Sequence, residues 1–303
     1  LDSELAAVAK LGFAITLSSA DFADAVARHG PARPLDVHVE VDTGMGRTGV
    51  AEADAFDEIV RIARCAAVNL RGVYTHFPVS DSDPGYTRAQ VTRFLDLVAR
   101  LRAAGVTIPL VHSANSAAVD GIEESRMDMV RPGLLAYGLH PAGGKPGIDV
   151  APIMSWKSRI VRVRRVAAGR TISYGRSFTT RRDSVIGVVP VGYGHGYPLR
   201  LSGRGSVLVA GRRVPIVGRV TMDMTMVDLT DLPSIPAEGD DVVLVGRQGD
   251  ESISFHDLAG WADTICYEIM CMISKRVPRT YFRRGKVETF KTLLGVLPNQ
   301  VAV

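Results

Sequence analysis

Short apolar runs alternate with segments of helical period over the first half of the chain, and this alternation constrains the fold more than any other feature. Strands are predicted over Ala14–Leu17, Val37–Asp42, Gly72–His76 and Pro109–His112, and Met129–Gly133 ends a fifth. Helices are predicted over Asp21–His29, Ala51–Ala67, Gly85–Ala104 and Asn115–Glu124. Repeated βα units are typical of a parallel sheet or a (β/α) barrel. A closed barrel of this kind has eight units and only about five are visible, so these units form either an open parallel sheet or a partial (β/α)8 barrel.

The second half of the chain changes to the period-two alternation of β-strands. A stretch rich in Gly and Pro at 141–147 marks the boundary. We expect the βα units over 1–150, a β-rich C-terminal domain over 151–285 and a weakly patterned tail over 286–303. Predicted elements of the second domain are strands near 155–160, Val185–Val191, Ser206–Val209, Val214–Val217, Thr225–Leu229 and Asp241–Val245, with helices at Phe255–Ala262 and Tyr267–Ser274. A β-sandwich or β-barrel fits this pattern.

Composition excludes several classes of protein. Hydrophobic residues are 46% and charged residues 22%, which excludes a disordered, collagen-like or coiled-coil chain. The net charge of +4 is spread thinly, so no nucleic-acid partner is expected. No apolar run approaches the roughly 18 residues of a membrane span, so no membrane partner is expected. Cys65, Cys266 and Cys271 form no CxxC pair, which argues against disulfides and a metal site and favours the cytoplasm.

Reactive side chains follow successive predicted strands. They lie in Glu40–Arg47, at His76, in His112–Ser116 and in Arg131–Leu134. In parallel barrels the reactive groups sit at the carboxyl ends of the strands, so these side chains should meet. Asn115 and Ser116 open a helix with a hydroxyl, an amide and backbone N–H groups, and Gly133 lets the backbone approach a ligand closely. These features predict a phosphorylated ligand near the last strands.

Ordered motifs along nearly the whole chain resemble those of alanine racemase, a pyridoxal-phosphate enzyme. In the barrel they are VDTGMGRTG at 41–49, THF at 75–77, HSANSAA at 112–118 and RPG at 131–133. In the second domain they are SWKSRI at 155–160, SYG at 173–175, VGY at 191–193, GRVTMDM at 218–224, YEI at 267–269 and RVPR at 276–279. The resemblance runs to about Tyr281 and is more specific for the family than for the substrate.

The resemblance implies a two-base interconversion of L- and D-alanine on pyridoxal 5'-phosphate, which supplies a peptidoglycan precursor. Tyr174 matches the catalytic tyrosine, which acts in the partner's site of a homodimer. Arg47 resembles the arginine that contacts this phenol and the substrate carboxylate. A phenol with a pKa of about 10 needs such a cation to act as a base. Arg131 resembles the arginine that faces the pyridine nitrogen, and His76 the histidine that links Arg131 to the tyrosine.

The remaining matches are to cofactor and substrate contacts. The phosphate shell of the family is matched by Ser116, Gly133, Leu134 and Tyr267, with Asn115 beside it. The residues that bound a small side-chain pocket are matched by Tyr193 and by Met222, the latter contributed by the partner subunit.

Glu40 stands seven residues before Arg47, where the family often carries a modified, negatively charged lysine. Here a glutamate supplies the negative charge unmodified. We therefore expect Glu40 to pair with Arg47 and to orient it toward Tyr174.

Two departures from the family pattern stand out. Gly194 and His195 stand where the family commonly has a small residue and an acid. The Schiff-base lysine of the family, in a KANAYG-like motif on the first barrel strand, has no counterpart, because the lysines are Lys10, Lys145, Lys157, Lys275, Lys286 and Lys291. We interpret the chain as a racemase without its N-terminal quarter. We expect it to be inactive alone, with Lys10 away from the pocket of His76, Ser116 and Arg131.

Three alternatives stay open. One is a racemase of serine or another small amino acid, which Tyr193 and Met222 do not decide. Another is a one-domain pyridoxal-phosphate carrier, against which the second domain argues. The third is a non-catalytic relative, which the presence of Tyr174, Arg47 and His76 opposes.

Overall fold

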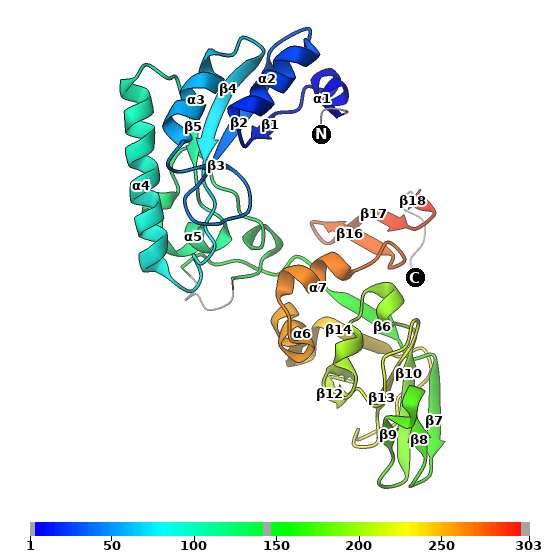
Figure 1. The fold of residues 1–303 in the computed structure, drawn as a ribbon. Coiled ribbons are helices and arrows are strands. Elements are labelled where there is room, and N and C mark those ends of the chain that lie inside the picture. The colour runs from blue at the N-terminus through cyan, green and yellow to red at the C-terminus, as the bar shows by residue number, and fades with distance from the viewer. Residues whose placement is uncertain (1–3, 142–146, 298–303) are drawn as a thin grey trace. The chain divides into compact units, whose positions relative to one another are not determined.

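The computed structural model describes residues 4–141 and 147–297 and divides into two compact units (Figure 1). The N-terminal unit spans Leu1–Pro152 and the C-terminal unit Ile153–Val303. Among the described residues, no helix is both long enough and apolar enough to cross a membrane.

A parallel sheet forms the centre of the N-terminal unit. Its strands run in the order β1 (Ile15–Leu17), β2 (Leu35–Asp42), β4 (Val68–Tyr74) and β5 (Leu110–His112), with β3 (Val50–Ala51) paired to β2. All of these pairs are parallel, and Met129 adds a parallel bridge to His112. In the described residues the sheet has two ends, β1 and β5, so the predicted partial barrel is confirmed.

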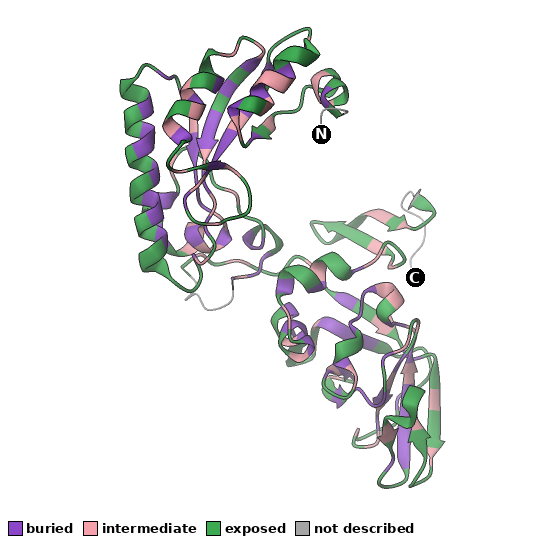
Figure 2. Cartoon of the chain, viewed as in Figure 1, coloured by how far each residue is buried: buried purple, intermediate pink, exposed green. Residues whose placement is uncertain are grey.

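Helices cover this sheet. They are α1 (Leu5–Leu11), α2 (Ala20–His29), α3 (Ala55–Arg64), α4 (Pro84–Ala103) and α5 (Ser116–Gly121), followed by the 3-10 turns η2 (Glu123–Ser125) and η3 (Leu135–Tyr137). Purple bands in Figure 2 mark their buried faces. Those of α1 to α4 pack with β2 and β4 into one apolar core, whereas Ala118 of α5 belongs to a second cluster with Phe77 and Val91. Local signals fix the ends of these helices. Ser19 caps α2 by accepting a hydrogen bond from Phe22, and Gly30 ends the helix in the left-handed conformation.

Four expectations for this unit need correction. The apolar period of 85–104 predicts Leu95 on the buried face of α4, but Leu95 is 40% exposed and Leu97 is buried instead, because Leu95 lies at the margin of the face centred on Phe94 and Val98. The helix predicted from Ala51 begins only at Ala55, since Val50 and Ala51 pair with β2 instead.

The other two corrections concern the last βα unit. The segment 129–133 is not a strand but a single bridge, because Pro132 has no N–H to pair and the Arg131 N–H donates to Ala114. The helix predicted to reach Glu124 ends at Gly121, where a 3-10 turn follows.

The C-terminal unit is built from antiparallel sheets. One sheet has the order β12 (Arg212–Pro215), β11 (Ser206–Val209), β14 (Asp241–Gln248) and β15 (Glu251–Ile253), with β6 (Trp156–Arg159) on β14. Another has the order β13 (Thr225–Asp228), β10 (Ser184–Val189) and β7 (Arg162–Val166). A short pair joins β8 (Thr171–Ile172) to β9 (Phe178–Thr179).

Helices α6 (Phe255–Ala262) and α7 (Cys266–Met272) follow β15, close to their predicted positions. The segment expected as a tail forms strands over its described part, where β17 (Lys286–Thr292) pairs with β16 (Arg279–Arg283) and β18 (Gly295–Leu297). The period-two pattern of this segment is weak because both of its faces are largely exposed.

Candidate functional site

Arg131 is the most heavily tethered side chain at the carboxyl ends of the parallel strands. Its Nη2 donates to the carbonyl oxygens of Thr75 at 2.9 Å and Ser113 at 3.2 Å. Its Nη1 lies 2.5 Å from Nδ1 of His112, and Nη2 lies 3.3 Å from Nδ1 of His76. Burial lowers the pKa of Arg131, but a guanidinium stays charged in proteins. The site therefore holds a fixed cation.

The contacts of Arg131 determine which ring nitrogen of His76 is protonated. An arginine has only donors, so Nδ1 of His76 must accept and the neutral ring carries its proton on Nε2. Burial is the first cause that lowers the pKa of His76, and the cations Arg131 and Arg47 add to it. The expected contact between His76 and Arg131 is thus present, with His76 in its neutral form near pH 7.

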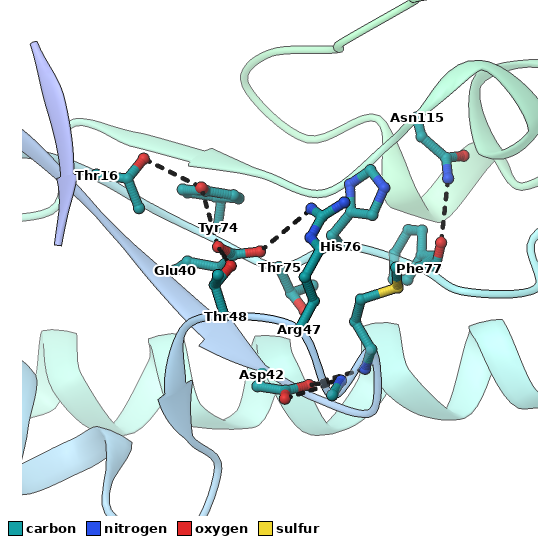
Figure 3. A network of polar contacts seen from close by, with 12 residues as sticks. Thr16, Glu40, Asp42, Arg47, Thr48, Tyr74, Thr75, His76, Phe77 and Asn115 are labelled. Carbon is teal, nitrogen blue, oxygen red and sulfur yellow. Dashed lines mark hydrogen bonds and ion pairs between the residues drawn. The ribbon is translucent and has the colours of Figure 1, made fainter. Parts of the chain in front are cut away.

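Glu40 and Arg47 meet at the end of β2, as Figure 3 shows. The expected contact is present, with Glu40 Oε1 4.0 Å from Arg47 Nη2. Thr48 donates to the other carboxylate oxygen of Glu40 at 2.6 Å, and the Tyr74 hydroxyl donates to the same oxygen at 3.3 Å. The buried carboxylate is therefore held on several sides.

The loop that carries Arg47 is folded around Asp42. Its carboxylate accepts from the backbone N–H groups of Gly44, Met45 and Gly46 at 2.8–3.1 Å. Burial alone would raise the pKa of Asp42, but these bonds outweigh it and the pKa is lowered. Gly44 and Gly46 have positive φ angles of 141° and 67°, which explains why this motif carries glycine at both positions.

Ser116 and the segment after Arg131 lie against each other. Leu135 N–H donates to Ser116 Oγ at 3.3 Å, which leaves the Ser116 hydroxyl hydrogen to donate elsewhere. Ser116 and Leu134 are buried, whereas the Gly133 backbone is exposed. A hydroxyl donor, a helix start and an accessible glycine backbone are suited to a phosphate group.

Asn115 holds the start of α5, next to Ser116, through hydrogen bonds of its side-chain amide. Its Oδ1 caps α5 by accepting from Ala118 N–H at 3.1 Å and also accepts from Ser80 at 2.8 Å. Its Nδ2 donates to the Phe77 carbonyl at 3.3 Å (Figure 3). The side-chain amide is thus engaged by the protein itself.

Tyr174, Tyr193, Met222 and Tyr267 belong to the C-terminal unit. Tyr174 is 72% exposed and follows Ser173, whose φ of 67° is rare for a residue other than glycine. The Ser173 hydroxyl donates to the Arg219 carbonyl at 2.7 Å, and this bond anchors the turn. Tyr267 lies on α7 and is 45% exposed.

The structure brings Tyr193 and Met222 onto paired loops. Tyr193 N–H donates to the Thr221 carbonyl at 3.0 Å, and Gly194 N–H to the Met222 carbonyl at 2.8 Å. Both side chains are about half exposed. His195 holds the first loop by accepting from Gly192 N–H at 3.2 Å, and burial followed by the nearby Arg276 lowers its pKa.

Among the described residues, Lys10 is the one lysine of the N-terminal unit, and it does not follow any strand of the parallel sheet. Lys10 is exposed in the last turn of α1, which leads into the amino end of β1, whereas Ser116 begins α5 after β5 (Figure 1). Lys145 falls outside the described residues, and the other lysines belong to the C-terminal unit.

The sequence reasoning missed Tyr74 and His38. Tyr74 stacks on His112 with 4.8 Å between ring centroids and lies under the Arg131 guanidinium. His38 contacts His112 from β2. The available signal was that His38 lies two residues before Glu40, on the same face of a strand.

Comparison with known proteins places the chain in a family. Residues 1–141 match the model "Alanine racemase, N-terminal domain" and 153–281 the model "Alanine racemase, C-terminal domain". The alanine racemase of Halothermothrix orenii is 45% identical over 247 residues, covering 81% of this chain and 65% of that protein. That of Symbiobacterium thermophilum is 46% identical, covering 91% and 74%.

Solved structures agree with the sequence comparison. Alanine racemase from Bacillus anthracis with bound L-Ala-P has a TM-score of 0.89 and 35% identity, covering 97% of this chain and 76% of that one. An alanine racemase from Clostridium difficile has a TM-score of 0.90 and 31% identity, with coverage of 97% and 77%. This chain therefore spans about two thirds to three quarters of the length of these relatives, and it belongs to the alanine racemase family.

Proposed function

We propose that this chain carries the cofactor-binding strand ends and the tyrosine-bearing domain of an enzyme that interconverts L- and D-alanine with pyridoxal 5'-phosphate. The observation that carries the proposal is the tethered Arg131, with His76, at the carboxyl ends of the parallel strands. Its support is the match to both family domains.

The donor set of the N-terminal unit fits the cofactor. Ser116, Gly133 and Leu134 offer a hydroxyl and backbone to the phosphate, with Asn115 as the cap behind them. Tyr267 of the C-terminal unit completes this shell in our proposal. Arg131 would face the pyridine nitrogen, and as a donor-only cation it would keep that nitrogen unprotonated. When bound, the cofactor supplies an electron sink for the charge left at the substrate α-carbon.

Tyr174 holds and moves the proton on one face of the substrate, in the site of the partner subunit of a homodimer. A phenol with a pKa of about 10 is a weak base near pH 7, so a neighbouring cation is needed. Arg47 supplies that cation and binds the substrate carboxylate, and His76 links the phenol to Arg131. The exposure of Tyr174 and Met222 supports their use by a partner subunit.

The base on the opposite face of the substrate is a lysine in this reaction. Among the described lysines, Lys10 is the one in the N-terminal unit, and it lies on α1. We therefore propose that the 303-residue chain alone does not racemise alanine.

Its cysteines, Cys65, Cys266 and Cys271, are free, which supports a cytoplasmic setting.

Alanine is the preferred substrate in this proposal, since the relatives compared here bear the name alanine racemase. Serine or another small amino acid is the second candidate, because Tyr193 and Met222 bound the pocket without a residue that selects a methyl group. The match over 153–281 argues against a one-domain carrier.

The experiment is racemisation by a lysine-bearing fusion, in which barrel strands that carry a KANAYG-like motif are placed ahead of Leu1. Purified fusion is loaded with pyridoxal phosphate and offered a panel of L-amino acids. Formation of D-alanine in preference to D-serine supports the proposal. A folded, cofactor-loaded fusion that forms no D-amino acid rejects it.

A further inference from the structure

A chain of hydrogen bonds leads from Arg131 away from the strand ends. Arg131 Nη1 lies 2.5 Å from Nδ1 of His112, and Nε2 of His112 lies 3.0 Å from Nδ1 of His38. His112 is 3% exposed, and its ring stacks on Tyr74 at an interplanar angle of 9°. The three groups are therefore joined within one packed layer.

The chain has one possible direction. The guanidinium of Arg131 only donates, so Nδ1 of His112 accepts and Nε2 of His112 carries the proton. That N–H donates to His38, so Nδ1 of His38 accepts as well. Both histidines are neutral in this arrangement. A proton added to His38 would set its Nδ1–H against the Nε2–H of His112, and a proton added to His112 would set its Nδ1–H against the guanidinium of Arg131. In either case one hydrogen bond of the chain is lost.

The sheet is built to allow this contact. His38 on β2 pairs with Gly72 on β4, and Gly72 pairs with Leu110 on β5. A Cβ at Gly72 would lie 2.6 Å from Nδ1 of His38 and 2.7 Å from the Leu110 carbonyl. Only glycine at this place lets a side chain on β2 reach across β4 to β5.

The surrounding charges also disfavour protonation. Burial lowers the pKa of His38, Arg71 and Arg131 lower it further, and Asp36 acts in the opposite direction. Burial, Arg131 and His38 lower the pKa of His112 to about 3, against an opposing effect of Asp128. Both rings are thus held neutral around pH 7.

We propose that His38 is a positioning residue, which holds Arg131 at its place through His112 by excluding protons from the pair. This rests on the proposed function in so far as Arg131 serves the cofactor. The hydrogen-bond chain itself is independent of that role.

The first test reads the proton positions directly. The full 303-residue chain is labelled with ¹⁵N-histidine, and the ring nitrogens of its seven histidines are followed by NMR from pH 5 to 8. His112→Gln identifies the His112 signals. We expect His112 protonated on Nε2 alone wherever His38 is neutral, and its ring signals to change as His38 gains a proton. A proton on Nδ1 of His112 while His38 is neutral, or a His112 spectrum that ignores protonation of His38, overturns the proposal.

Matched variants test the acceptor. His38→Asn keeps an acceptor near the position of Nδ1, but its side chain cannot be protonated. His38→Leu removes the acceptor. His29→Asn, at an exposed position, is the control. We expect His38→Asn and His29→Asn to leave the Nε2 proton of His112 protected from exchange. In His38→Leu that protection should fall by about tenfold or more, because the buried N–H loses its partner. If His38→Leu does not fold, loss of protection in His38→Asn overturns the proposal instead.

The second readout is pyridoxal phosphate affinity against pH, measured by fluorescence quenching. In the unaltered chain and His29→Asn the affinity should fall by about threefold or more below the pKa of His38, which lies under the ordinary 6.5. In His38→Asn this fall should move to lower pH. Identical profiles for His38→Asn and the unaltered chain overturn the proposal. If no variant binds the cofactor, the proposed function fails while the NMR result still decides the role of His38.

Discussion

Glu40 Oε1 lies 4.0 Å from Arg47 Nη2 at the end of β2, and the two side chains are 5% and 55% exposed. Because Arg47 is half in solvent, the ion pair itself contributes under about 1 kcal/mol to stability. The hydroxyls of Thr48 and Tyr74, which donate to the same carboxylate, depend on it more strongly. Glu40 is thus a buried carboxylate that contacts a half-exposed cation on one side and two hydroxyls on the other.

Glu40→Ala should lower the free energy of unfolding by about 1–3 kcal/mol, because the hydroxyls of Thr48 and Tyr74 lose their hydrogen bonds to a buried carboxylate. Glu40→Gln keeps an acceptor and should lose about 1 kcal/mol or less. Urea unfolding measures both. Glu52→Ala, which breaks an exposed pair with Arg93, is the matched control and should change stability by about 0.5 kcal/mol or less. Equal losses in Glu40→Ala and Glu52→Ala would contradict this account.

Acid should destabilise the N-terminal unit through His112. Its folded pKa of about 3 lies below the unfolded value of 6.5, so the unfolded chain binds the extra proton first. The contribution of neutral His112 to the free energy of unfolding is fully present above pH 6.5 and is lost as the pH falls toward 3. Urea midpoints between pH 7 and 4 measure this loss.

His112→Gln provides the comparison, because glutamine does not titrate. Its midpoint should fall less between pH 7 and 4 than that of the unaltered chain. His29→Gln, at an exposed position, should follow the unaltered chain. A His112→Gln profile parallel to the unaltered one would mean that His112 carries no such linkage.

The sequence predicted β1, β2, β4, β5 and α2–α4 of the N-terminal unit because periodicity is a local property, whereas α1, β7 and the strands β16–β18 were not predicted. It failed at 129–133, where Pro132 and the Arg131–Ala114 bond override the apolar pattern. The contact between His38 and His112 joins residues 74 positions apart. It depends on the register of β2, β4 and β5 and on the missing side chain at Gly72, which no local pattern reveals.

Gly192→Ala should disturb the loops that carry Tyr193 and Met222. The added Cβ would lie 2.1 Å from the Thr221 carbonyl oxygen, so backbone must move, at a cost of about 1–3 kcal/mol. Gly260→Ala, in α6 with open space around the new Cβ, should be neutral or slightly stabilising. Thermal unfolding compares the two, and similar melting temperatures would contradict the close packing of these loops.

The 303-residue chain, mixed with pyridoxal phosphate and L-alanine, should form no D-alanine. Lys10 lies in the last turn of α1, before the amino end of β1, and loss of one base of a two-base pair lowers rates by several orders of magnitude. An absorbance band near about 420 nm that disappears on borohydride treatment, together with D-alanine formation, would show that another lysine has taken this role. Lys10→Ala would then identify it.

The most direct test of the account is the rate of L- to D-alanine conversion by the lysine-bearing fusion with and without Tyr174→Phe. The account predicts D-alanine from the fusion and a loss of about three orders of magnitude or more in kcat for Tyr174→Phe, with cofactor binding retained. Equal conversion by the two proteins, or none by a folded and cofactor-loaded fusion, would contradict it.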